Sequence, residues 1–566
     1  MKYIFFIPII LISFNLFCQN LQQRIIVENS FSVIKNSNNI IPFQNLDQKK
    51  FFVAGFDKNT KNFIYSFKRY CNIDNEKEAN IFIFLISNKN ELNIYNELIK
   101  PLKKDIIFIV FDITDSSFIE NLKKISNTII CTNLKDSLTY DYAAQILFGA
   151  FSPHNECIRF KYTVPLEVGI DSAFIFFKID SIVNEAIRIK AFPGCQIFAS
   201  INQKVIFYKS YGFIDYDSIL PVNNEFIYDL ASITKIAASA PSLMLLFQNN
   251  YFGLNDYISK HLKQFKNTNK SNIQIIDALM HQSKLKPFIP FWKYFIDKNK
   301  VLDEKFFSKN KNLRFKNFVA ANIYSNRKLQ KKVYEIILKS ELLEKKQYKY
   351  SDLFFYFVPI LVKEKSKKNF DDYLNSNFYL KLGANSLCFN PLTKFDKTII
   401  VPTEYDSVFR KQLLWGTVHD EGAALMNGIS GHAGLFGNAN DLAKLMQMFM
   451  NYGVYGNEKY LDSCIVENWT SYQDNKYGNH RGIVFDKPLF ADKQKQTASE
   501  MASERSFGHS GFTGTFVWAD PQYKFIFVFL SNRVYPTRNN NKITQNNIRT
   551  QIHDVLYQAI ENSRKN

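Results

Sequence analysis

Short apolar runs separated by amphipathic segments predict a small α/β domain in residues 50–150. The runs with the length and composition of buried strands are 51–56, 81–86, 105–111 and 128–132. The segments between them, such as Glu91–Lys104 and Ser117–Lys124, space their apolar residues as a helix does. Strands that alternate with helices form a parallel sheet covered on both faces. The interior of this region contains no catalytic constellation.

From about Ser181 the pattern predicts an antiparallel sheet with helices. The expected elements are a helix at 181–190, strands at 195–201 and 204–210, a mostly helical middle at 231–450 with a Lys-rich stretch at 293–349, strands at 514–518 and 524–531, and a helix at 545–561. Asn202-Gln203 and Asp520–Tyr523 separate the paired strands as hairpin turns do. We therefore expect one sheet assembled from distant segments, beside a helical insertion.

The composition fits two or three globular domains and excludes a disordered or fibrous chain, since 46% of the 566 residues are hydrophobic. The net charge of +19 raises the alternative of a nucleic-acid partner. The charges are scattered and form no basic arm or stripe, however, and overused Lys, Asn, Ile and Phe are typical of an AT-rich coding sequence. We expect no nucleic-acid partner.

The N-terminus has the pattern of a secretory signal peptide at residues 1–18. One lysine precedes the apolar run Tyr3–Phe17, which is too short for a membrane span of about 20 residues and is interrupted by Pro8. Cys18 permits a lipoprotein alternative, but bulky Phe17 stands where a small residue is expected. We expect an exported protein, periplasmic or associated with the cell envelope, with no membrane span after cleavage. The other cysteines form no CxxC pair, so no zinc or redox motif is predicted.

Ser232-Ile-Thr-Lys235 begins a predicted helix, Ala231–Phe247, which Pro241 is expected to kink. Residues three apart lie on one helix face, so the serine and the lysine should meet. The helix dipole and burial both lower the pKa of a lysine here, so that its neutral amine could activate the serine. The spacing recurs in pairs that we interpret as surface residues: Ser32–Lys35, Ser283–Lys286 and Ser308–Lys311.

Two later motifs give this pair a context. Tyr350-Ser-Asp352 begins another predicted helix, and His509-Ser-Gly511 opens a strand of the last hairpin. This order resembles the serine β-lactamase and penicillin-binding protein superfamily, in its class C β-lactamase-like branch. The resemblance runs from about Phe192 to the C-terminus and is carried by Tyr228–Lys235, Leu279–Ser283, Tyr350–Leu353, Gly428–Phe436 and Gly508–Thr515. It implies a β-lactamase/transpeptidase-like domain over 165–566.

Three further segments resemble a Bacteroidota-type subgroup in which a family 3 glycoside hydrolase is fused to a β-lactamase-related domain: Val401–Glu404, Val418–Asp420 and Phe529–Pro536. The resemblance implies that residues 19–155 correspond to the flavodoxin-like C-terminal domain of the glycosidase. Its barrel needs about 200 residues or more, and too few precede Phe51. We expect no glycosidase activity and a docking or structural role.

The resemblance also implies roles for single residues. Ser232 is the acylated nucleophile, Lys235 its base, and Tyr350 the relay that passes a proton to the leaving group. His509 takes the place of the strand lysine, near a substrate carboxylate or the Tyr350 hydroxyl. A neutral imidazole holds an anion less firmly than lysine does, which argues against a potent β-lactamase.

The same motifs predict the substrate-binding strand. By the resemblance, the amides of Ser232 and Phe512 form the oxyanion hole, and Gly511 and Gly514 let the strand approach the substrate backbone closely. Ser510 is a further substrate-binding residue of this strand. Asp352 stands where relatives often have asparagine. It could repel an anionic substrate or bond to Lys235, and the sequence leaves both alternatives open.

Glycines cluster in Gly422–Gly437, around His419, Asp420 and His432. A metal site is conceivable there, but a tight structural turn is the favoured interpretation, and His281 is expected to be a structural loop residue. No metal or organic cofactor is predicted.

Together these features predict an exported serine hydrolase that cleaves an amide or ester bond through an acyl-serine intermediate, with peptidoglycan-derived muropeptides as substrate. The alternatives are a D-Ala carboxypeptidase, an esterase or a β-lactamase on the same residues, or a non-catalytic peptidoglycan-binding scaffold.

Overall fold

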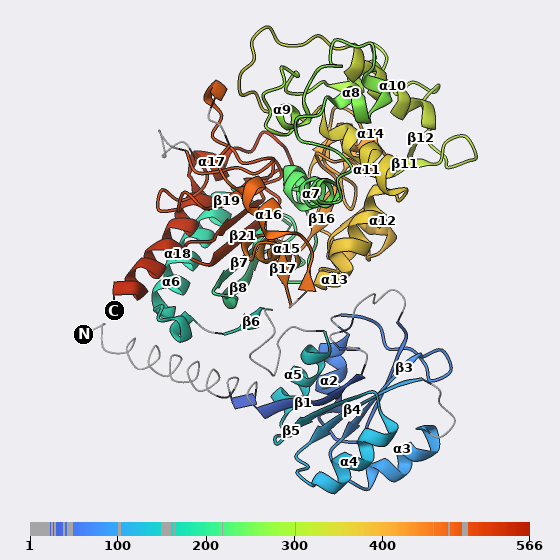
Figure 1. Ribbon diagram of the computed structural model, residues 1–566, viewed down its shortest axis with the longest axis vertical. Helices are drawn as coiled ribbons and strands as arrows, with labels where there is room; N and C mark the ends of the chain where they lie inside the picture. The colour runs from blue at the N-terminus through green and yellow to red at the C-terminus, as the bar shows by residue number, and fades with distance from the viewer. Residues whose placement is uncertain are drawn as a thin grey trace. The chain divides into compact units, whose positions relative to one another are not determined.

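The computed structural model describes residue 23 and residues 26–27, 30–37, 40–41, 43, 49–68, 70–99, 104–148, 160–163, 165–217, 219–299, 301–456, 458–473, 476–489 and 496–565. The predicted signal peptide with Cys18 lies outside these residues, as does Cys157. The chain divides into two units, Met1–Val164 and Pro165–Asn566, each of which is described by itself (Figure 1). None of the described helices combines the length and hydropathy needed to cross a bilayer.

The first unit is a five-stranded sheet in the order β1-β5-β4-β3-β2. Its strands are β1 (Phe31–Asn36), β2 (Phe51–Gly55), β3 (Ile81–Ile86), β4 (Asp105–Phe111) and β5 (Thr128–Thr132). The pairs β2–β3, β3–β4 and β4–β5 are parallel, which confirms the four predicted strands. The sequence analysis missed β1, a mixed polar and apolar edge strand that pairs antiparallel with β5.

Helices cover both faces of this sheet, as predicted. They are α2 (Thr60–Phe67), α3 (Glu91–Ile99), α4 (Ser116–Ile125) and α5 (Ser137–Leu147). Alternate residues of each strand point to opposite faces, so Ile83 packs with α2 and α5, and Phe84 packs with α3 and α4. Burial on both faces explains why these strands appear in the sequence as continuous apolar runs.

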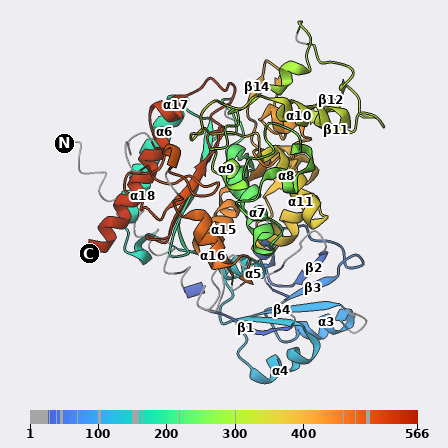
Figure 2. The same ribbon diagram turned by 45° about the horizontal axis from the view of Figure 1, so that its top comes forward.

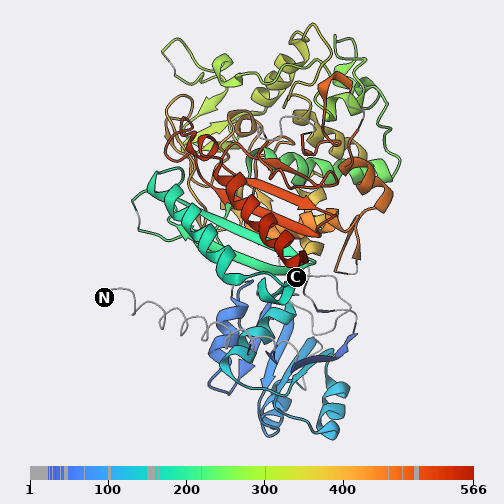
Figure 3. The same cartoon turned by 90° about the vertical axis from the view of Figure 1, so that its left-hand side faces the viewer.

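The second unit contains the antiparallel sheet expected from distant segments. Its strands β19, β20, β21, β7 and β8 lie in that order. Their bounds are β7 (Gly194–Ile201), β8 (Lys204–Gly212), β19 (Phe507–Ser510), β20 (Phe516–Asp520) and β21 (Phe525–Ser531). Both predicted hairpins are confirmed, and Phe529 of β21 pairs with Ile197 of β7. Helices α6 (Ser172–Arg188) and α18 (Ile548–Lys565) pack on one face (Figure 3).

The middle of this unit carries helices and a small sheet (Figure 2). The main helices are α7 (Ala240–Gln248), α9 (Ile275–Leu279), α10 (Arg327–Lys339), α11 (Val358–Ser366), α14 (Glu421–Leu425) and α15 (Ala439–Met450). The Lys-rich stretch also forms three short strands: β10 (Phe307–Ser308), β11 (Asn317–Ala320) and β12 (Ile323–Ser325). The expectation of a helical insertion was therefore correct only in part.

The prediction of one uniform helix over Ala231–Phe247 was wrong. Ala231–Ile233 form a 3₁₀ turn and Lys235–Ser239 a π-helical turn, and α7 starts only after them. Pro241 lies in the first turn of α7, where a missing N–H leaves no bond unmade. The helix is therefore irregular before Pro241, around the Ser232 motif, and not at the proline.

Candidate active site

Ser232 lies in the 3₁₀ turn Ala231–Ile233, which begins two residues after strand β9 (Tyr228–Asp229). Ala231 has a φ of 47°, in the left-handed region that side chains other than glycine rarely occupy. The Asp229 carboxylate accepts the Ala231 N–H at 2.8 Å and stabilises this conformation. The turn presents Ser232, which is half-buried, at the start of the helical segment.

Lys235 lies one turn further along, and its ammonium group is completely buried. Its Nζ atom donates to Ser232 Oγ at 3.1 Å and to the His432 carbonyl at 3.1 Å. The same atom lies 2.7 Å from Asp352 Oδ1. The predicted meeting of Ser232 and Lys235 is thus present, and Asp352 and the glycine-rich loop of His432 hold the amine in place.

The predicted pKa of Lys235 was wrong in direction. Burial lowers the pKa of this lysine, but the Asp352 carboxylate and the Tyr350 phenol outweigh burial and raise it above the ordinary value. Lys235 therefore carries a proton in the resting site at neutral pH. Of the two alternatives for Asp352, the structure favours the bond to Lys235.

Tyr350 lies against both Lys235 and His281. The centre of its ring is 5.0 Å from Lys235 Nζ and 4.4 Å from the centre of the His281 ring. Its hydroxyl is buried, and Lys235 and Ser232 are the hydrogen-bonding side chains next to it. Burial raises the pKa of Tyr350 and the Lys235 ammonium opposes it, so the phenol stays protonated. His281 is a loop residue, as expected, but it also supports the Tyr350 ring.

His509 reaches the same site from β19. Its Nδ1 lies 2.7 Å from the Ser510 carbonyl, so Nδ1–H donates there and Nε2 is left as an acceptor, which has no partner among the described residues. Burial lowers the pKa of His509 well below its usual range, and the Arg481 and Lys235 charges lower it further. The imidazole is therefore neutral, as the sequence analysis expected.

A second cation near His509, besides Lys235, is Arg481, which was not predicted from the sequence. The guanidinium is buried, with its carbon atom 5.8 Å from the centre of the Tyr350 ring. It pairs with Asp486, donates to the Val484 carbonyl at 2.5 Å, and has no partner at Nε among the described residues. No motif marked Arg481, because its position depends on a loop fold that the sequence pattern does not encode.

Asp486, the partner of Arg481, also forms backbone hydrogen bonds with the outer edge of strand β19. Its backbone N–H donates to the Gly508 carbonyl at 2.8 Å, and its carbonyl accepts the Gly508 N–H at 3.1 Å. Gly508 belongs to β19, the last strand of the sheet on this side. The outer edge of β19 is therefore occupied at Gly508.

The loop after β19 packs on the turn that carries Ser232. Thr513 Oγ1 donates to the Asp229 carbonyl at 2.7 Å, and Thr515 Oγ1 donates to the Leu230 carbonyl at 3.1 Å. A Cβ atom on Gly511 would lie 2.6 Å from the Leu230 carbonyl oxygen, so only glycine fits there. Gly511 thus allows a close approach to the turn itself, and the predicted close approach to a substrate stays a prediction.

The side chains of Phe512 and Ser510 lie in different surroundings. The Phe512 ring is 51% exposed, and the Arg533 guanidinium carbon lies 4.6 Å from the ring centre. The Ser510 side chain lines a cavity of about 260 Å³ with Phe516 and Trp518. Because strand residues alternate, this cavity lies on the opposite face of β19 from His509. Ser510 therefore contributes its backbone, and not its hydroxyl, to the His509 side.

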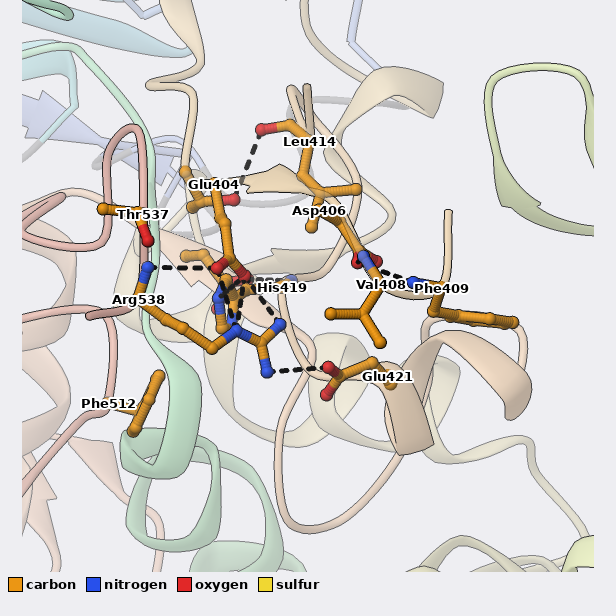
Figure 4. Close-up of polar contacts among 12 residues, drawn as sticks. Glu404, Asp406, Val408, Phe409, Leu414, His419, Glu421, Phe512, Thr537 and Arg538 are labelled. Carbon is orange, nitrogen blue, oxygen red and sulfur yellow. Dashed lines mark hydrogen bonds and ion pairs between the residues drawn. The ribbon is translucent and has the colours of Figure 1, made fainter. Parts of the chain in front are cut away.

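His419 and His432 do not converge on one site. His419 Nε2 lies 2.9 Å from Glu404, and Glu404 also binds the Arg538 guanidinium at 2.6–2.8 Å (Figure 4). His432 Nε2 lies 2.9 Å from Asp420 instead. Each imidazole has its own carboxylate partner, so these side chains act as ties between loops, and the glycine cluster is a structural turn.

Comparison with known proteins places this site in a family. A family model described as Beta-lactamase matches residues 179–550. A Salmonella agona protein named "Putative D-alanyl-D-alanine carboxypeptidase" is 30% identical over 415 residues, which are 68% of this chain and 88% of that protein. The chain therefore belongs to the Beta-lactamase family.

Solved structures that are similar to this chain have TM-scores below 0.5. A penicillin-binding protein homologue from Caulobacter crescentus covers 68% of this chain and 97% of its own, with a TM-score of 0.48 and 13% identity. A class C beta lactamase from Rhodobacter sphaeroides covers 68% and 99%, with a TM-score of 0.48 and 12% identity. The family match supports a serine hydrolase in the second unit.

Proposed function

We propose that this protein is a serine hydrolase that forms an acyl-enzyme on Ser232. The observation that carries the proposal is the 3.1 Å contact between Ser232 Oγ and the buried Lys235 Nζ, in a chain of the Beta-lactamase family. A serine is a weak nucleophile until a neighbouring base removes its proton. The buried amine is the group best placed to do so.

The proton path follows from the contacts of Lys235. The resting ammonium, paired with the Asp352 carboxylate at 2.7 Å, must first lose a proton to solvent. The neutral amine then takes the Ser232 proton as Oγ attacks the carbonyl carbon. The Tyr350 O–H, next to Ser232 and Lys235, donates to the leaving amine, and Lys235 returns a proton to the phenolate. Water then attacks the acyl carbon and gives a proton to the neutral Lys235 amine, which passes it to Ser232 Oγ as the acyl–Oγ bond breaks and the carboxylic acid leaves.

We propose a peptidoglycan-derived peptide as substrate and an amide as the bond that is cleaved. Removal of a terminal D-alanine is the form that the named relatives favour. The buried Arg481 supports a substrate with a carboxylate, because its Nε has no partner among the residues that the structure describes and neutral His509 supplies no charge. Ester and β-lactam hydrolysis use the same residues and are the alternatives.

Export and the origin of the first unit are further proposals. The N-terminal pattern of residues 1–18 supports a periplasmic or envelope location. The mostly parallel sheet is compatible with a flavodoxin-like domain derived from a family 3 glycoside hydrolase. Such a domain would serve as a docking unit for cell-wall material.

Mass spectrometry after treatment with a fluorophosphonate and with benzylpenicillin tests the enzyme against the scaffold alternative. We expect one adduct, on the peptide that contains Ser232, and none in Ser232→Ala. Ser308→Ala is the matched control, because Ser308 has the same Ser-x-x-Lys spacing but lies in β10. No adduct with either probe would refute the proposal.

Product analysis then separates the substrates. The protein is incubated with a pentapeptide ending in D-Ala-D-Ala, with a muropeptide, and with a chromogenic ester. Release of free D-alanine identifies a carboxypeptidase, and cleavage at another amide identifies a muropeptide amidase. Turnover of the ester alone would overturn the peptide proposal.

A further inference from the structure

Asp229 is a buried carboxylate that the proposed reaction does not use. It lies three residues before Ser232, is 2% exposed, and forms no ion pair among the described residues. Its two oxygens accept backbone amides instead, Ala231 N–H at 2.8 Å and His419 N–H at 2.7 Å. A buried charge is costly unless hydrogen bonds compensate it, so this arrangement requires both bonds.

The first bond shapes the turn before the nucleophile. An aspartate that accepts the N–H two residues later forms an Asx turn. Here that turn holds Ala231 in the left-handed conformation, which disfavours residues other than glycine. The direction of the next peptide unit, which contains the Ser232 N–H, depends on this conformation.

The second bond fixes the carboxylate itself. His419 is held from the other side, because its ring bonds to Glu404 at 2.9 Å and Glu404 bonds to Arg538 (Figure 4). The Asp229 side chain therefore cannot rotate without breaking a bond to a segment that is anchored elsewhere.

The backbone of Asp229 ties in the opposite segment. Its carbonyl accepts the Thr513 hydroxyl at 2.7 Å. Thr513 follows Phe512, whose amide is the second predicted oxyanion donor. One residue thus contacts the turn before Ser232 through its side chain and the loop after β19 through its backbone.

We propose that Asp229 is a positioning residue that holds the amides of Ser232 and Phe512 in register as one oxyanion hole. The inference rests on the proposed acyl transfer at Ser232. It assigns Asp229 no contact with substrate, so its loss should slow bond-making steps and leave substrate binding nearly unchanged. A displacement of about 1 Å in such a site costs about 100-fold in rate.

The test is Asp229→Asn in the full chain. Asparagine has the same shape but offers one acceptor and one donor, so it faces one of the two N–H groups with another N–H. We expect kcat and the rate of fluorophosphonate labelling to fall about 100-fold while KM changes less than threefold. Thr513→Val, which removes the backbone tie alone, should lower kcat in the same pattern and covers the case in which Asp229→Asn does not fold.

Asp441→Asn is the matched control. Asp441 is also buried and accepts a backbone amide, Ser386 N–H at 2.7 Å, but it lies in α15. The Asp441→Asn variant should lose stability but keep the wild-type rate of fluorophosphonate labelling. Wild-type kcat in Asp229→Asn, or an equal loss of kcat in Asp441→Asn, overturns the inference. Absence of labelling in the wild-type chain refutes the proposed function instead.

Discussion

The two sides of Ser232 are built from similar residues that make different contacts. On one side, Lys235, Asp352 and Tyr350 meet side chain to side chain. On the other, the Asp229 carboxylate accepts backbone amides and is tied through His419 to Glu404. Charges that face each other change each other's pKa, whereas a carboxylate that holds amides fixes where the backbone lies. The first side should therefore govern protonation and the second geometry.

Removal of the cation on the charged side should have the largest effect. Lys235→Met deletes the proposed base and leaves Asp352 without its cationic partner. We expect kcat/KM to fall by about 10³-fold or more, because proton transfer by a positioned group contributes about 10²–10⁴. Steady-state kinetics on the preferred substrate measure this.

Lys270→Met is the control for that substitution. Lys270 is also buried but donates to backbone carbonyls of Leu338 and Ser340. It should keep its catalytic rate whatever its stability. A Lys235→Met variant within tenfold of the wild type would contradict the assignment of Lys235 as base.

On the side where Asp229 holds backbone amides, Glu404→Gln should lower the free energy of unfolding. Arg538 and His419 hold the pKa of Glu404 at about 2, below its ordinary value of 4.5. Breaking this buried pair costs about 3 kcal/mol. Because the folded pKa is depressed, this stabilisation is complete above pH 4.5 and is lost as the pH falls towards 2.

Urea unfolding at pH 7, 5 and 3 measures how much the free energy of unfolding differs between the wild type and Glu404→Gln. This difference should be largest at pH 7, nearly the same at pH 5 and smaller at pH 3. A difference that stays constant down to pH 3 would show that the ion pair does not stabilise the fold.

Asp352→Asn should shift the pH profile of the rate to lower pH. The base must be neutral, so the rate rises with pH as Lys235 loses its proton. The Asp352 carboxylate raises the pKa of Lys235, and asparagine removes this contribution. The rising limb of kcat/KM for a neutral ester should therefore move to lower pH. An unmoved limb would mean that another group titrates.

Ala231→Gly should have the smallest effect. Glycine adopts the left-handed conformation of Ala231 readily but gains entropy in the unfolded chain, and the two contributions oppose each other. We expect the free energy of unfolding to stay within about 1 kcal/mol and kcat within threefold. A tenfold fall in kcat would show that Asp229 alone does not hold the turn.

What the sequence could predict follows the range of the interactions. The four parallel strands and the Ser232–Lys235 contact depend on local periodicity, and both are present. The pKa of Lys235 was mispredicted because its partner, Asp352, is distant in the chain. Arg481 and the role of Asp229 were missed for the same reason, since loops that meet only in the folded state create their surroundings.

The backbone bridge between Asp486 and Gly508 bears on which ligands fit. A peptide that adds itself to a sheet needs free amide and carbonyl groups along the outermost strand. At Gly508 both groups are already engaged, so an extended chain that pairs with β19 near Ser510 must turn away from the sheet within two residues. A long segment that continues along this edge in both directions would have to displace the Arg481 loop.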